Sequence, residues 1–158
     1  MEFVCGYNGD NISATTAQLN SPVGVGLDHR GNIFIADYGN NRVREVNTSG
    51  TITTFAGDGN CGFLGDGGPP TSAELCFPEG VAITTGGTVY IADSGNFRIR
   101  KVAANTISTY AGSGAVGYNG DGLAALSTNL DDPVAVTLNP SGIVYVVDDV
   151  QNRVRRIH

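Results

Sequence analysis

The sequence predicts an all-β fold made of three similar units that follow a pattern of four short antiparallel strands, the last unit being incomplete. Two sets of residues recur at intervals of 56 and 55 positions: Pro22, Pro78 and Pro133, and Asp37, Asp93 and Asp148. The chain also holds 23 glycines in 158 residues, beside many Val, Ile, Thr and Tyr. This composition is typical of short strands joined by tight turns. A four-stranded repeat of about 50 residues is typical of a β-propeller blade.

The middle unit shows the four expected strands in order. Residues 80–84 (GVAIT) form the first, and a GG turn leads to the second at residues 88–93 (TVYIAD). Residues 97–102 (FRIRKV) alternate charged and apolar side chains, as a half-buried strand does. Residues 106–112 (TISTYAG) form the fourth. The same pattern divides the chain into blades at residues 1–56, 57–111 and 112–158.

The third unit lacks a counterpart of the fourth strand. TITTFAG at residues 51–57 and TISTYAG at residues 106–112 have no equivalent after NRVRRIH, and no stray fourth strand is expected before the first unit. The prediction is therefore eleven strands, with an unpaired edge on the last blade.

The repeated unit resembles an NHL repeat. It combines Gly-Asp-Gly-Gly at residues 65–68, a Leu-x-x-Pro step at residues 75–78, YIAD at residues 90–93 and N-x-R-I-R at residues 96–100. The resemblance implies a propeller that usually has six blades, of which three are present. Such a half-ring exposes apolar blade faces, and these favour a partner. Either the sequence is a piece of a longer chain, or copies complete one another.

Three glycine-rich segments are interpreted as crossover loops from one blade to the next: YNGD at 7–10, FLGDGG at 63–68 and YNGDGL at 118–123. Glycine permits positive φ there, and Asp can bond to its own backbone in a turn. Three leucines are expected to fill the space between blades: Leu19, Leu75 and Leu130. The weaker alternative for these loops is calcium binding through Asp10, Asp66 and Asp121, because calcium prefers oxygen ligands. No other cofactor is expected.

Eight of the nine cationic side chains lie on the expected third strands. A ring of such arginines could bind RNA, as the resemblance to RNA-binding NHL domains of tripartite-motif proteins implies. The alternative is a set of structural ion pairs between neighbouring strands: Asp37 with Arg42, Asp93 with Arg98, and Asp148 with Arg153. A net charge of −6 favours the ion pairs and argues against a nucleic-acid partner.

The cysteines suggest an oxidising compartment. Cys61 and Cys76 bracket the middle crossover loop and are predicted to form a disulfide, which leaves Cys5 as a free or interchain thiol. Sequons at Asn11 and Asn47 are compatible with N-glycosylation. No signal peptide is visible in this chain, and no apolar stretch reaches the ~20 residues of a membrane helix. We expect an extracellular or cell-surface protein, with the cytoplasm as the alternative.

The sequence shows no catalytic constellation. The amidating lyase with a similar propeller holds its metal through several histidines, whereas this chain has only His29 and His158, far apart in sequence. We therefore expect a non-catalytic interaction or structural module that binds a protein or glycan, or assembles with itself. The alternative is part of a metal-dependent lyase or hydrolase whose site residues lie in other blades.

Overall fold

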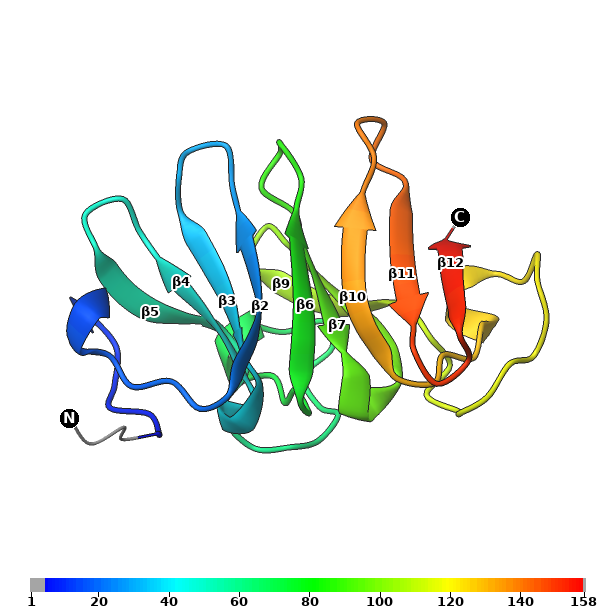
Figure 1. The fold of residues 1–158 in the computed structure, drawn as a ribbon, viewed down its shortest axis with the longest axis horizontal. Coiled ribbons are helices and arrows are strands. Elements are labelled where there is room, and N and C mark those ends of the chain that lie inside the picture. Colours follow the sequence, from blue (N-terminus) through cyan, green and yellow to red (C-terminus); the bar gives the residue numbers. More distant parts are fainter. Residues whose placement is uncertain (1–4, 158) are drawn as a thin grey trace.

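The computed structural model describes residues 5–157, which form three twisted antiparallel sheets standing side by side (Figure 1). The sheets hold five, four and three strands in chain order. The expected all-β architecture of successive blades is confirmed.

Each sheet is a meander of neighbouring strands. The first contains β1 (Ile12–Ser13), β2 (Pro22–Leu27), β3 (Ile33–Asp37), β4 (Arg42–Val46) and β5 (Thr51–Ala56). The second contains β6 (Pro78–Ile83), β7 (Val89–Asp93), β8 (Arg98–Ala103) and β9 (Thr106–Ala111). The third contains β10 (Pro133–Leu138), β11 (Val144–Asp148) and β12 (Arg153–Ile157).

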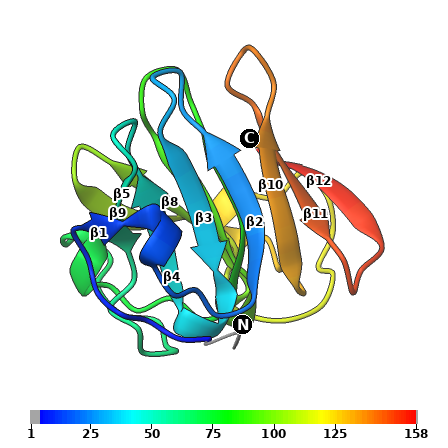
Figure 2. The ribbon, with the colours of Figure 1, turned by 60° about the vertical axis from the view of Figure 1, so that its left-hand side comes forward.

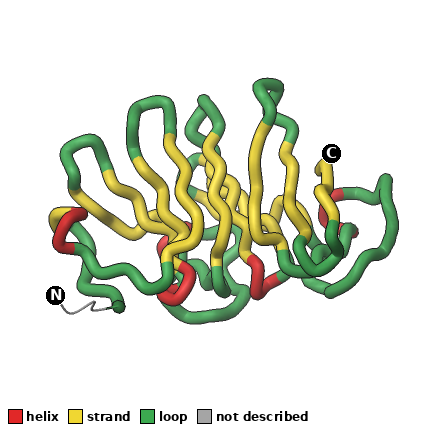
Figure 3. The backbone as a smooth tube through the Cα atoms, in the orientation of Figure 1, coloured by secondary structure: helices red, strands yellow, loops and turns green. Residues whose placement is uncertain are grey.

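Within residues 5–157, five short 3-10 turns lie on the connections between strands (Figure 3). They are η1 (Ala14–Thr16), η2 (Tyr38–Asn40), η3 (Pro70–Ser72), η4 (Ser94–Asn96) and η5 (Ala125–Ser127). In the first two blades, η2 and η4 join the second strand to the third, and each ends in a left-handed residue, Asn41 at φ 52° and Phe97 at φ 56°. The turn plus one left-handed residue reverses the chain, so the third strand starts at the arginine that follows.

The first blade has one strand more than expected. The crossover loop before β2 runs alongside β5, and its two residues Ile12 and Ser13 pair with Ile52 and Thr51 to form β1. The middle crossover loop likewise lies alongside β9, although it forms no strand there. Gly67 donates to the Ile107 carbonyl at 2.8 Å, and the Gly68 carbonyl accepts from the Ile107 amide at 3.0 Å. The first unit therefore holds this short strand besides the four expected ones, and the described strands number twelve instead of the expected eleven.

The core lies between neighbouring blades rather than within one sheet. Leu75 is fully buried in the cluster between the first two blades, and Leu130 in the cluster between the second and third, whereas Leu19, the third leucine expected in such a place, is only half-buried. Close approach depends on glycine: a Cβ at Gly24 would overlap the Glu79 carbonyl, and one at Gly80 would meet the Ala135 backbone at 2.9 Å. Glycines on one blade thus let the backbone of the next blade approach closely.

Candidate functional site

One polar cluster recurs in each blade and joins its third strand to a crossover loop. In the second blade, Arg100 has no exposed surface, and its Nη1 donates to Asp93 Oδ2 at 3.1 Å. Its Nη2 donates to Asp66 Oδ1 at 2.6 Å. In the first blade, Arg44 Nη2 donates to Asp10 Oδ1 at 2.9 Å. We call the buried arginine, the aspartate that ends the second strand and the loop aspartate the polar cluster of a blade.

The fourth strand completes this cluster. The backbone amide and Oγ1 of Thr109 on β9 donate to Asp66 Oδ2 at 2.9 and 2.7 Å. Thr54 Oγ1 on β5 donates to Asp10 Oδ1 at 3.0 Å. One loop carboxylate therefore ties together the third strand, the fourth strand and the crossover loop.

The ion pairs are formed by different arginines from those that the sequence analysis assigned. Arg42 lies opposite Asp37 in the strand register, yet its Nη1 donates to the Asn40 carbonyl at 3.1 Å, and Arg44 pairs with Asp37 instead. The second and third blades repeat this exchange, with Arg100 pairing with Asp93 and Arg155 with Asp148. A long side chain reaches the diagonal cross-strand neighbour readily. The sequence held one indication of this exchange of arginines: residues two apart, such as Arg42 and Arg44, lie on the same face of a strand.

The outer arginines stack on aromatic side chains of the crossover loops. The Cζ atoms of Arg42, Arg98 and Arg153 lie 4.1, 3.8 and 4.1 Å from the ring centres of Tyr7, Phe63 and Tyr118. Cation–π contacts of this kind stabilise the loop against the strand. The repeated arginines thus contact the protein's own loops and carboxylates.

In the third blade the cluster is open. The Asp121 side chain is 82% exposed, whereas Asp10 and Asp66 are 32% and 36% exposed. Arg155 Nη2 lies 3.8 Å from Asp121 Oδ1 and donates to the Gly120 carbonyl at 3.0 Å. No threonine of a fourth strand contacts Asp121 among the described residues.

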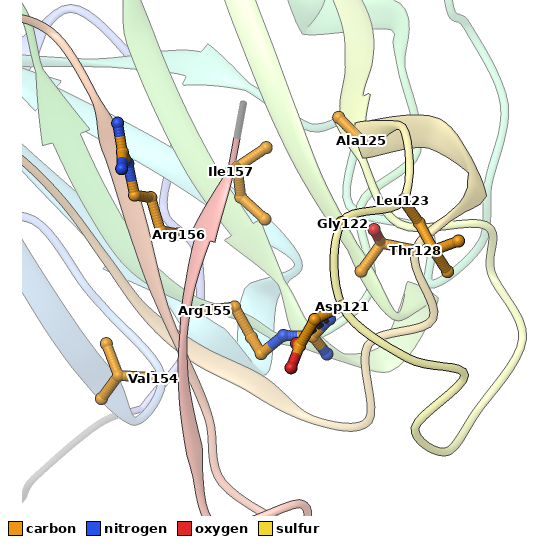
Figure 4. Close-up of a pocket in the computed structure, with 9 residues that line it drawn as sticks. All are labelled: Asp121, Gly122, Leu123, Ala125, Thr128, Val154, Arg155, Arg156 and Ile157. Atoms are coloured by element: carbon orange, nitrogen blue, oxygen red, sulfur yellow. Dashed lines mark ion pairs between the residues drawn. The ribbon is translucent and has the colours of Figure 1, made fainter.

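A cavity of about 220 Å³ occupies the corresponding place (Figure 4). Its walls are β12, from Val154 to Ile157, and the crossover loop with η5: Asp121, Gly122, Leu123, Ala125 and Thr128. In the other two blades, β5 and β9 lie between the equivalent elements.

The three strand-end aspartates have raised pKa values because they are buried. They are Asp37, Asp93 and Asp148. Burial also opposes ionisation of Asp66, but hydrogen bonds from Thr109 and the charge of Arg100 outweigh it and lower the pKa of Asp66.

The third cluster also differs at the last residue of the turn between the second and third strands. Asn40 and Asn96 donate to Asp37 and Asp93 at 2.8 Å, whereas their counterpart Gln151 donates to Asp131 at 2.8 Å. The Asp148 Oδ2 atom is left without a hydrogen-bond partner. The third cluster is therefore the least complete of the three.

The described residues bring no set of three or more His, Cys, Asp or Glu side chains together as metal ligands. The loop aspartates that were candidates for calcium contact arginine instead: Asp10 contacts Arg44, Asp66 contacts Arg100, and Asp121 lies near Arg155. His29 is exposed in the β2–β3 hairpin, and His158 lies outside the described residues.

The remaining candidate residues lie on the surface or in the middle crossover loop. Cys61 and Cys76 form a disulfide across that loop, and Cys5 is an exposed thiol. Asn11 and Asn47 are exposed, and the side-chain oxygen of Asn47 accepts hydrogen bonds from the amides of Ser49 and Thr51. None of the helices described between residues 5 and 157 has the length and apolar character needed to span a bilayer.

Comparison with known proteins identifies the repeat. The profile of the NHL repeat matches residues 19–45 and 75–102. Teneurin-1 of Mus musculus is 36% identical over 105 residues, which make up 58% of this chain and 4% of that protein. The chain therefore spans only a small part of this relative.

Two solved structures have the same fold at low sequence identity. A protein of unknown function from Bacteroides thetaiotaomicron matches with a TM-score of 0.69 and 19% identity, over 80% of this chain and 32% of that one. A gluconolactonase from Xanthomonas campestris matches with a TM-score of 0.59 and 16% identity, over 83% of this chain and 36% of that one. These findings show that the chain contains NHL repeats and that its successive blades have the fold of part of a β-propeller.

Proposed function

We propose that this chain is a non-catalytic interaction or structural module outside the cell, which binds protein and assembles with further copies of itself. Its recurring charged side chains support this reading, because Arg44 and Arg100 are buried and paired within their blades. Paired and buried guanidinium groups are not free to bind RNA. The net charge of −6 would also repel the phosphates of a nucleic-acid partner.

The exposed face of the first blade carries the proposal. Val25 is 65% exposed on β2, while its repeat equivalents Val81 and Val136 are each only 7% exposed because a neighbouring blade covers them. Val23 and Leu27 on the same face are 58% and 64% exposed. Figure 2 brings this sheet forward and shows no other sheet in front of β2. This face therefore carries the apolar side chains of an interface between blades, but no neighbouring blade covers it.

The disulfide and the two sequons support an extracellular setting. A disulfide such as Cys61–Cys76 persists in oxidising compartments and is rare in the cytosol. Asn11 and Asn47 are both exposed and open to glycosylation. Because of this extracellular setting, we include glycans among the ligands proposed for the module.

Sedimentation velocity of two valine variants tests the proposal. Val25→Glu places a charge on the exposed face, and we expect it to abolish self-association of the 158-residue chain. Val116→Glu is the matched control, because Val116 is 57% exposed on a crossover loop away from this face. Equal behaviour of the two variants would contradict an interface at β2.

The gluconolactonase of similar fold favours a second candidate function, part of a metal-dependent hydrolase or lyase with its site residues in other blades. Metal analysis and a lactone-hydrolysis assay distinguish the two. One divalent ion per chain together with hydrolysis would support the enzyme. Self-association without a bound metal ion and without lactone hydrolysis would support the interaction module.

A further inference from the structure

A cavity of about 480 Å³ lies between the first two blades, at the edge where their first hairpins stand next to each other (Figure 1). One wall is the first blade, with the β2–β3 hairpin and strands β3, β4 and β5. The other wall is the end of β6 and the β6–β7 hairpin of the second blade. All lining residues fall between positions 28 and 87, so the cavity is a feature of the interface between two neighbouring blades.

The floor of this cavity is apolar. Phe34 and Phe55 meet edge to face there, with their ring centres 4.9 Å apart. Phe55 and Ile83 are half-buried and pack against the core cluster that the two blades share. The apolar part of a ligand would leave water on contact with these side chains, which favours its binding.

One carboxylate lies beside the apolar floor without a counter-charge. Glu45 is opposite Phe34 in the pairing of β3 with β4, and it is half-buried. None of the ion pairs within residues 5–157 involves Glu45. Burial, and after it the negative charge of Asp28, raise the pKa of Glu45. The other two titratable side chains of the cavity are His29 and Arg30, and both are exposed.

The second carboxylate of the cavity is already used by its own hairpin. Asp28 Oδ1 accepts hydrogen bonds from the backbone amides of Arg30 and Asn32, each at 2.9 Å. These bonds fix the turn between β2 and β3 and favour the ionised form of Asp28. Glu45 is therefore the carboxylate that is free to pair with a bound cation.

The other repeats show that blade packing does not require an acid at this position. The repeat counterparts of Glu45 are Lys101 and Arg156, which are both cationic. The corresponding cavity between the hairpins of the second and third blades is smaller, about 280 Å³. Its described lining, which includes Leu138 and Pro140, holds no charged side chain. The larger volume and the unpaired carboxylate thus occur together in the first groove.

We propose that the cavity between the first two blades binds a small organic cation, with a single ammonium group on an apolar body. The ammonium pairs with Glu45, and the apolar body lies on Phe55 and Ile83. An anion would be repelled by Glu45 and Asp28, and a neutral apolar ligand would leave Glu45 further buried without a counter-charge. This inference goes beyond the proposed function and does not depend on self-association.

Isothermal titration calorimetry with three related compounds tests the site. Cyclohexylmethylamine carries both the ammonium and the apolar body, and we expect saturable binding of one molecule per chain. Cyclohexylmethanol has the same body without the charge, and methylamine has the charge without the body. Each of these two should bind about tenfold more weakly or less. No saturable binding of cyclohexylmethylamine, or equal binding of cyclohexylmethanol, would overturn the proposal.

Two glutamate variants locate the ligand on the structure. Glu45→Gln should weaken binding of cyclohexylmethylamine about tenfold, because an ion pair is lost. Glu79→Gln is the matched control, since Glu79 is also half-buried with a raised pKa but lies on β6 outside the cavity. It should bind the amine like the unmodified chain. Loss of binding in both variants, or in neither, would overturn the assignment to Glu45.

Two lysine variants test the same cavity without changing Glu45. Thr85 lies on the exposed β6–β7 hairpin that lines the cavity, so Thr85→Lys should fold and repel the bound ammonium. Ser141→Lys adds the same charge to the exposed β10–β11 hairpin and is the control. We expect the affinity for cyclohexylmethylamine to fall about tenfold in Thr85→Lys alone. Equal affinities of the two lysine variants would overturn the proposed site.

A further compound separates a free amine from the side chain of a protein partner, because lysine also carries an ammonium on an apolar chain. Nα-acetyl-lysine methylamide presents that side chain with its neighbouring peptide groups. Weaker binding of this compound than of cyclohexylmethylamine supports the small organic cation. Tighter binding that is lost in Glu45→Gln would overturn it and assign the cavity to a lysine of a protein partner.

Discussion

Replacing Arg100 with methionine should destabilise the protein far more than the same change at Arg98. Arg100 is fully buried and makes three hydrogen bonds, to Asp66 Oδ1, Asp93 Oδ2 and the Glu74 carbonyl. Its loss leaves the carboxylate of Asp93 buried without its counter-charge, which costs about 3–5 kcal/mol of unfolding free energy. Arg98 donates to two carbonyl oxygens and stacks on Phe63, so Arg98→Met should cost about 1 kcal/mol.

The pH dependence of this loss distinguishes an ion pair from a packing effect. Burial raises the pKa of Asp93 above its value in the unfolded chain, so the protonated form favours the folded state at low pH. This contribution is lost as the pH rises through the folded pKa. Without Arg100 the pKa should rise further, and the deficit of Arg100→Met should be larger at pH 7 than at pH 4.5.

Urea denaturation at both pH values measures these free energies. Arg98→Met should show the same small deficit at each pH. The assignment of the ion pair to Arg100 would be refuted if Arg98→Met cost as much as Arg100→Met, or if the deficit of Arg100→Met did not change with pH.

Three further predictions follow from the same contacts. The lowered pKa of Asp66 gives a stability that is present above its unfolded pKa and lost as the pH falls through its folded pKa, so Asp66→Asn should flatten the acid limb in urea titrations; an unchanged acid limb would contradict this. Removing the Cys61–Cys76 disulfide by double substitution to serine should lower the free energy of unfolding in urea by about 3 kcal/mol relative to the unmodified protein, and this difference should vanish when the unmodified protein is reduced first. Gly24→Ala should cost about 1–3 kcal/mol by overlap with the Glu79 carbonyl, while Gly86→Ala, whose Cβ meets only Thr84 Oγ1 at 3.8 Å, should stay near zero in the same assay.

The sequence was sufficient to predict the blades because every repeat imposes the same pattern. Periodic prolines and aspartates set the strand starts and ends, and the plugs Leu75 and Leu130 could be named from their place after the loop. Local patterns of this kind do not depend on long-range geometry. Loop glycines such as Gly65 and Gly120 adopt the positive φ values that the turn chemistry requires.

The pairing of arginines and the first strand could not be predicted in this way. Arg42 and Arg44 share a face, and only the position of the crossover loop decides which guanidinium turns toward Asp37. β1 depends on a backbone path from a loop to an edge strand forty residues away in sequence. The unpaired edge of β12 could be predicted from the repeat, but the cavity between β12 and the crossover loop at Gly122 could be found only in the structure.

The molar mass of the unmodified chain in solution tests whether copies of the chain assemble through the exposed face of β2. Light scattering across a concentration series should show a mass that rises from 16.3 kDa toward twice that value or more. A constant 16.3 kDa at every concentration, with no binding of a hydrophobic dye, would contradict it.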